Sequence, residues 1–100
     1  MTAAGPDDEL RREMGCTRDE FLRWLPGASR HAPIVATGDV WQILSEHGRV
    51  EITLAELAAR RIASITLPVL EVRFRFVDMD DAARAAFLEY FDHYTRRGGG

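Results

Sequence analysis

The segment from residue 70 to 76 alternates strictly between apolar and charged residues. Its even positions are apolar and its odd positions are charged, with Leu70, Val72, Phe74 and Phe76 separated by Glu71, Arg73 and Arg75. A repeat of two is the period of a β-strand with one buried face. We therefore expect a half-buried strand here, with the arginines on its solvent side.

Directly after this strand, the apolar spacing changes to three and four residues. One stripe is formed by Ala83, Phe87, Tyr90, Phe91 and Tyr94. This period is typical of an amphipathic helix, and one of Asp78, Asp80 or Asp81 is expected to cap its start. The strand and the helix are expected to bury each other.

A shorter helix is predicted near the N-terminus. Thr17 and Glu20 have the spacing of a capping box, and Phe21, Trp24 and Leu25 follow at helical spacing before Pro26-Gly27. We expect the helix to stop at Pro26-Gly27. Residues 1–15 are charged and lack apolar periodicity, so they are interpreted as a flexible arm.

The middle of the chain favours strands. Residues 40–46 and 49–54 flank His47-Gly48 and indicate a β-hairpin, and residues 34–35 could pair briefly as an edge segment. Residues 54–67 are ambiguous, because their first half has high helix propensity whereas Ile62–Leu67 is β-branched. The favoured interpretation is a turn at 55–59 followed by a strand at 60–67, and a helix remains the alternative.

These elements predict an α+β fold with two layers. A short N-terminal helix, an antiparallel sheet of three or four strands and a long C-terminal helix on one sheet face make up a single domain over residues 16–97, followed by a glycine tail at 98–100. The expected core consists of Phe21, Trp24, Leu25, Ile43, Val50, Ile52, Ile62, Leu70, Val72, Phe74, Phe76, Phe87, Tyr90 and Phe91.

Composition narrows the classes of function. All thirteen basic residues are arginine, so lysine Schiff-base chemistry is excluded, and the net charge of −3 makes nucleic acid an unlikely partner. Cys16 is the single cysteine, which leaves no intramolecular disulfide. No signal peptide or membrane-spanning segment is recognisable, so we expect a cytoplasmic protein without a membrane partner.

The C-terminal residues carry one candidate chemistry. Arg96, Arg97, Gly98, Gly99 and Gly100 resemble the tails of ubiquitin-like modifiers and small sulfur carriers. The resemblance implies a carboxylate that is activated at Gly100 and then transferred. Those tails leave a strand, whereas this one leaves a predicted helix, and a glycine helix cap is the alternative explanation.

The arginines of the strand carry the second candidate. Residues 72–79 followed by a helix look like part of an RNA-recognition motif, but Arg73 and Arg75 stand where that motif has small residues. If the phenylalanines are core, Arg73 and Arg75 lie on the other face, where Arg60 and Arg61 could join them. Such a face could bind an acidic protein or a phosphate-bearing ligand, or could be a solvated face balanced by Glu51 and Glu71.

No catalytic motif is recognisable, and the three histidines lack metal-binding spacing. We therefore expect no catalytic residues, no metal and no cofactor. The predicted function is a non-enzymatic module that binds another protein or itself as a homodimer. The alternatives are a carrier activated at its Gly-Gly end and a small-molecule or nucleic-acid binder through the arginine face.

Overall fold

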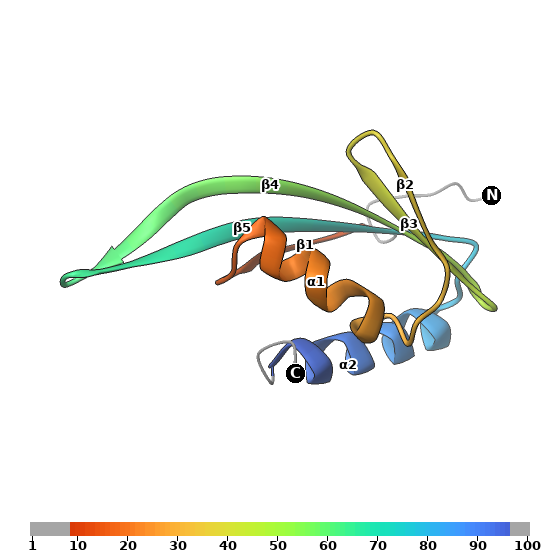
Figure 1. The fold of residues 1–100 in the computed structure, drawn as a ribbon. Helices are drawn as coiled ribbons and strands as arrows, with labels where there is room; N and C mark the ends of the chain where they lie inside the picture. The colour runs from red at the N-terminus through yellow and green to blue at the C-terminus, as the bar shows by residue number, and fades with distance from the viewer. Residues whose placement is uncertain (1–8, 97–100) are drawn as a thin grey trace.

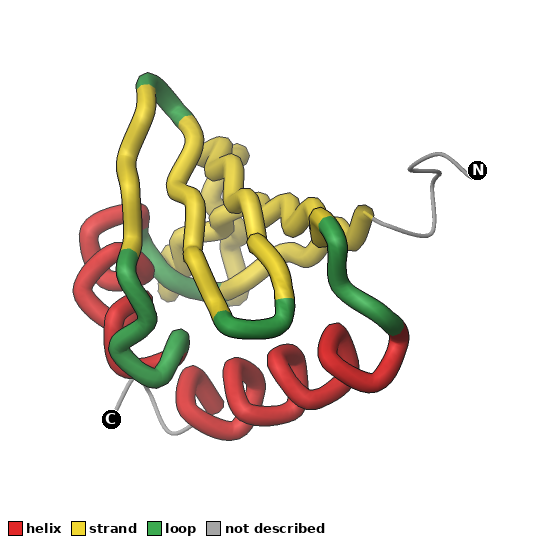
Figure 2. Tube along the Cα trace, turned by 90° about the vertical axis from the view of Figure 1, so that its right-hand side faces the viewer, coloured by secondary structure: helices red, strands yellow, loops and turns green. Residues whose placement is uncertain are grey.

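The computed structural model describes residues 9–96, which form five strands and two helices. In chain order these are β1 (Glu9–Met14), α1 (Arg18–Ala28), β2 (Ile34–Thr37), β3 (Val40–Ser45), β4 (Gly48–Ile62), β5 (Ile65–Val77) and α2 (Asp81–Arg96). The strands make one antiparallel sheet in the order β1-β5-β4-β3-β2. Both helices cover the same face of this sheet (Figures 1 and 2). The α+β class is therefore confirmed, and the expected count of three or four strands is corrected to five.

Strand β1 lies within residues 1–15, the segment that the sequence had suggested was a flexible arm. It pairs with β5 from Glu9 opposite Arg75 to Met14 opposite Leu70. Leu10 and Met14 pack against the core, while the side chain between them, Arg12, forms an ion pair with Asp92 of α2. Residues 9–14 thus belong to the sheet, and residues 1–8 lie outside the described part of the chain.

Strands β4 and β5 form a hairpin much longer than the rest of the sheet. Strand β3 pairs with β4 only as far as Thr53, and β1 pairs with β5 only from Leu70 onward. The remainder, residues 55–69, projects from the body as a two-stranded ribbon that we call the arm (Figure 1). The arm helps to give the molecule a longest dimension of 49 Å, against 27 and 26 Å in the other directions.

The arm corrects both interpretations of residues 54–67. Strand β4 continues to Ile62 without a turn at 55–59 and without a helix, and the turn falls at residues 63–64, where Ala63 has φ of 56°. The register shifts between Leu57 and Arg60, which places Ala58 and Ala59 opposite Pro68. Pairing with β5 supplies the backbone hydrogen bonds that a helix would have made internally, so sheet context overrides local propensity.

The core lies between the sheet and the helices. Phe74 is fully buried and its ring meets Phe91 edge-on, with centroids 5.2 Å apart and an interplanar angle of 89°. Ten of the expected core residues are buried: Phe21, Leu25, Ile43, Val50, Ile52, Leu70, Val72, Phe74, Phe76 and Phe91. Trp24 and Phe87 are partly buried against them. Ile62 was wrongly assigned to the core, because it sits at the tip of the arm and is 54% exposed.

The helix ends follow the predicted capping with one correction. Thr17 and Glu20 form the capping box of α1, and Asp80 accepts a hydrogen bond of 2.8 Å from the backbone of Ala83 at the start of α2. Helix α1 continues through Pro26 to Ala28 instead of stopping at Pro26-Gly27. The ring of Tyr94 lies so close to Gly27 that a side chain there would clash with it. The glycine is therefore needed where α1 and α2 meet.

Candidate functional site

The sheet face turned away from the helices, called here the outer face, carries the arginines singled out in the sequence. Residues opposite each other on paired strands share a face, so Glu51 lies beside Arg75 there, and Thr53 beside Arg73. Glu51 is within 3.2 Å of Arg49 and 3.8 Å of Arg75. The charged ladder is the resulting set of alternating charges on the outer face: Arg11, Glu13, Arg49, Glu51, Glu71, Arg73 and Arg75.

Glu71 is the most enclosed member of the charged ladder, with only 8% of its surface exposed. Its carboxylate accepts hydrogen bonds from the Nε atoms of Arg11 and Arg73, the latter at 3.1 Å. The hydrogen bond from Arg11 lowers the pKa of Glu71, and the positive charges of Arg11 and Arg73 act in the same direction against the effect of burial. Glu71 is therefore held in its charged form.

The lowered pKa of Glu71 predicts an acid-dependent loss of stability. A carboxylate whose pKa is depressed on folding stabilises the fold above its unfolded pKa of about 4.3, and that stabilisation is lost as the pH falls through the folded value. Glu71→Gln is expected to be less stable than the wild type at neutral pH, and this difference is expected to shrink below about pH 4. Urea unfolding midpoints measured from pH 7 to 3, with Glu56→Gln as the control, would check this. A difference that stays constant with pH would contradict it.

The four predicted binding arginines do not share one face. Arg73, Arg75 and Arg60 lie on the outer face and each has a glutamate within reach, Arg60 being 3.7 Å from Glu13. Arg61 pairs across the arm with Thr66 and lies on the opposite face. Because the carboxylates neutralise much of the positive charge, the outer face offers little net attraction for a polyanion. A binding role for these arginines stays a prediction.

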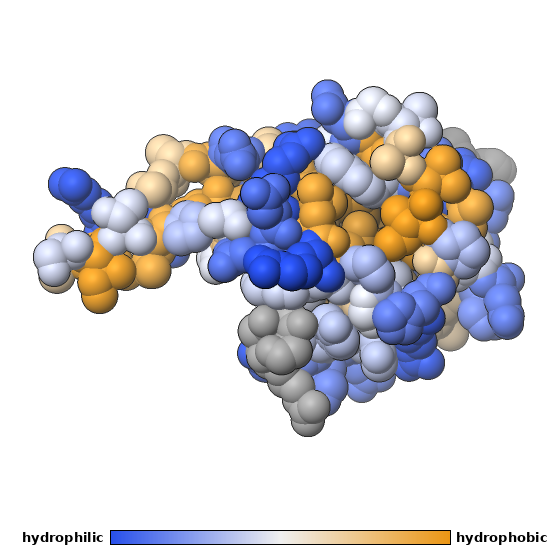
Figure 3. Space-filling view, viewed as in Figure 1, coloured by the Kyte–Doolittle hydropathy of each residue, from blue (hydrophilic) through white to orange (hydrophobic). Residues whose placement is uncertain are grey.

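Large apolar side chains are exposed at two places on the outer face. Along the arm they form a stripe, the arm stripe, made of Leu57, Ile62, Ile65 and Leu67. At the far edge of the sheet, Val35 of β2 and Leu44 of β3 form a smaller group, the edge patch. Figure 3 shows apolar surface near the tip of the arm, well away from the body. The charged ladder lies between these two apolar regions.

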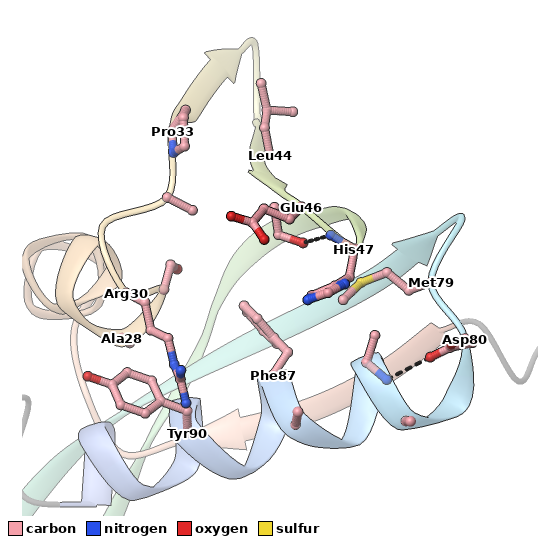
Figure 4. A pocket seen from close by; sticks show the side chains of 16 residues that line it. Ala28, Arg30, Pro33, Leu44, Glu46, His47, Met79, Asp80, Phe87 and Tyr90 are labelled. Carbon is pink, nitrogen blue, oxygen red and sulfur yellow. Dashed lines mark hydrogen bonds between the residues drawn. The ribbon is translucent and has the colours of Figure 1, made fainter.

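A cavity of about 750 Å³ opens on the helix side of the molecule. Its walls are the end of α1 with the segment that follows, the turn between β3 and β4, and the first half of α2 (Figure 4). Alanines 82, 83 and 86 line the α2 side, where the side chain of Phe87 also rises from the helix. Arg30, Glu46, His47 and Asp80 bring charged or polar groups to the rim. The size and the mixture of apolar lining with a few polar groups are typical of small-molecule sites.

Other candidate chemistry is limited in the described part of the chain. Cys16 is buried, and burial raises the pKa of its thiol to about 11, which makes it a poor nucleophile. Residues 9–96 contain no group of three or more His, Cys, Asp or Glu side chains suited to a metal ion. Neither helix is long and apolar enough to cross a membrane. Arg96 ends α2, and the rest of the proposed tail, Arg97 to Gly100, lies outside the described residues.

The sequence did not reveal the cavity or the arm stripe, although the residues of the arm stripe left a partial signal. The cavity is assembled from three segments that are distant in sequence, so no local pattern marks it. The arm stripe had a signal in the β-branched residues of 62–67, which were expected in one continuous strand, whereas the structure divides them between the end of β4 and the start of β5. Comparison with protein-family models, curated proteins and solved structures gives no match to this chain.

Proposed function

We propose that the protein is a non-enzymatic interaction module that pairs with a second copy of itself through the outer face. The observation that carries this proposal is the arm, which holds Ile62 and Ile65 more than half exposed at its tip. A two-stranded ribbon is marginally stable in water by itself, and a contiguous apolar stripe marks an interaction site. A location in the cytoplasm remains part of the proposal.

A partner is expected to pack on the face of the arm, because the edges of the arm are poorly suited to pairing with an additional strand. Its β5 edge carries Pro68, which has no backbone N–H, and its β4 edge carries the register shift at Ala58 and Ala59. Proline, bulges and charges are the features that discourage edge-to-edge pairing. The arm stripe, in contrast, lies open on the outer face, so a partner gains most by covering that face.

Self-association is favoured by how charge and apolar surface are distributed. The charged ladder contains both signs in alternation, so a strongly acidic or strongly basic partner gains little from it. A second copy offers glutamates to the arginines and arginines to the glutamates. When two outer faces meet about a two-fold axis, the arm stripe of each copy can cover the edge patch of the other, which buries both apolar regions at once.

The test is the oligomeric state of two matched double variants. The wild type is expected to sediment as a dimer, and Ile62→Thr/Ile65→Thr is expected to weaken that dimer at least about tenfold, because two large apolar side chains no longer become buried. Threonine keeps the strand propensity, so the fold should be retained. Arg61→Thr/Thr66→Ser changes the opposite face of the same arm and should leave the dimer intact.

Two results would overturn the proposal. A wild-type protein that sediments as a monomer over the whole accessible concentration range excludes the second copy as partner. A dimer that survives Ile62→Thr/Ile65→Thr excludes the arm stripe as the contact. Val35→Thr tests the edge patch separately and should also weaken the dimer.

A further inference from the structure

We propose that the cavity between α1, α2 and the β3–β4 turn binds a small molecule with an apolar body, an anionic group at one end and a cationic group at the other. This cavity opens on the helix side, and Leu44 of the edge patch also lines it. The proposal rests on three residues of the cavity lining, Arg30, Ser29 and Glu46.

Arg30 occupies a backbone position where glycine is usual. Its N–H donates to the carbonyl of Gly27 and the N–H of His31 donates to that of Pro26, which is the Schellman arrangement at the end of a helix. Arg30 has φ of 56° and His31 has φ of 61°, both in the left-handed region that costs an ordinary residue free energy. Residues in strained backbone conformations are concentrated at binding sites, where the surrounding structure holds the side chain in place despite the cost in free energy.

The guanidinium of Arg30 is positioned but not neutralised. Its central carbon lies 4.3 Å from the centroid of the Tyr90 ring, a cation–π contact that fixes the group beside the cavity (Figure 4). Within residues 9–96, no carboxylate forms an ion pair with it. Its N–H groups are therefore available to a carboxylate, which a guanidinium can bind with two parallel hydrogen bonds.

Glu46 supplies the opposite charge from another wall. It belongs to the turn between β3 and β4, and Figure 4 shows its carboxylate directed toward the α1 side of the cavity, with Phe87 rising from α2 below it. This carboxylate is exposed, and no described residue forms a hydrogen bond or ion pair with it, so it is open to a ligand. The other acid at the rim, Asp80, is already engaged with the backbone of Ala83. A ligand ammonium group would pair with Glu46, and an apolar body would lie along Phe87 and the α2 alanines.

Ser29 adds to the cavity lining a hydroxyl that no described residue engages. This residue is 5% exposed, and its buried hydroxyl oxygen has no hydrogen-bond partner within the described residues. A buried hydroxyl without a partner is uncommon in folded proteins and destabilises them. Ser29 lines the cavity next to Arg30, so small adjustments on binding would bring a polar ligand group within its reach.

The probe that tests this is 4-(aminomethyl)benzoate, a flat apolar ring with a carboxylate and an ammonium group at opposite ends. Two matched compounds each lack one charge, namely 4-methylbenzoate and 4-methylbenzylamine. In titrations followed by amide chemical shifts, the zwitterion is expected to bind at least about fivefold more tightly than either control, since each loses one charge-assisted contact. The shifts are expected at the cavity-lining segments and not at the arm.

Three pairs of variants locate the contacts. Arg30→Gly suits the left-handed backbone, so the fold should be retained while the preference for the carboxylate is lost. His31→Gly, at the adjacent left-handed residue, which lies outside the cavity lining, should bind normally. Glu46→Gln should abolish the preference for the ammonium group, with Glu89→Gln as its control. Ala86→Leu places a larger side chain in the cavity lining and should prevent binding, whereas Ala85→Leu, exposed and outside the lining, should not.

The outcomes are decisive. Equal binding of the zwitterion and 4-methylbenzoate would overturn the role of Glu46 and with it the proposed ligand class. Retained preference in Arg30→Gly would overturn the role of Arg30. An absence of cavity-localised shifts with all three compounds, or binding that survives Ala86→Leu, would overturn the site itself.

Discussion

Phe74→Ala is expected to reduce the free energy of unfolding by about 3–5 kcal/mol, enough to leave a domain of this size largely unfolded. Phe74 is fully buried on β5, between β1 and β4. Its ring contacts Phe91 and Phe87 of α2 edge-on, with centroid distances of 5.2 and 6.4 Å, and stacks against Phe76 at 6.2 Å. Truncation removes the side chain that joins the sheet to the helix and leaves a cavity that the surrounding rings cannot fill.

Equilibrium urea unfolding followed by tryptophan fluorescence measures this loss. Phe74→Leu is the matched control, because it keeps an apolar side chain and should cost considerably less. A loss below about 1 kcal/mol for Phe74→Ala would show that the position is not in the core. If the alanine variant is unfolded without urea, its midpoint can be recovered in a stabilising co-solvent such as sucrose.

Gly48→Ala is the second substitution with a large expected cost, about 2–5 kcal/mol from steric overlap and backbone strain together. Gly48 begins β4 with φ of 137°, a conformation that L-residues rarely adopt. A Cβ atom there would lie 2.7 Å from the carbonyl oxygen of Asp78 and 2.8 Å from that of Val77. These are backbone atoms at the end of β5, so they cannot move aside without disturbing the approach to α2.

Gly38→Ala separates the two contributions to this cost. Gly38 also has positive φ, at 60°, but a Cβ atom there meets no neighbour within 4 Å. Only backbone strain acts at this position, so its cost should be about 1–2 kcal/mol. Equal thermal destabilisation by the two alanine substitutions would show that steric overlap at Gly48 is relieved in solution.

The parts of the fold that were predictable are those where side-chain pattern and burial agree. The alternation at 70–76 places four apolar residues inward, and all four are buried. The capping box at Thr17 and the cap at Asp80 use local hydrogen bonds that sequence spacing reveals directly. In these segments the local preference and the tertiary contacts select the same conformation.

Strand β1 was missed because its inward face is not apolar throughout. Leu10 and Met14 face the core, but Arg12 lies between them and is satisfied by Asp92 of α2. That ion pair joins residues eighty positions apart, so no window of sequence around β1 contains its partner. The alternation of Leu10 and Met14 with charged neighbours was a weak signal that could have indicated a strand.

The arm and the cavity were unpredictable for different reasons. Residues 55–61 favour a helix by themselves, and only their pairing with β5 makes them a strand. The cavity depends on Arg30 occupying a position where glycine would normally mark the end of a helix. A sequence pattern predicts the residue types that are usual at a position. It therefore cannot identify a position where an uncommon residue is held by tertiary contacts, such as that between Arg30 and Tyr90.

Because the single thiol is buried, its reactivity can be used to follow local opening of the fold. Cys16 lies between β1 and α1 and is 1% exposed, so a reagent such as a maleimide reaches it only when this part of the fold separates. The rate of labelling therefore reports how often this part of the fold opens, without any engineered probe. The protein thus contains its own reporter of local unfolding at one edge of the sheet, far from the tip of the arm.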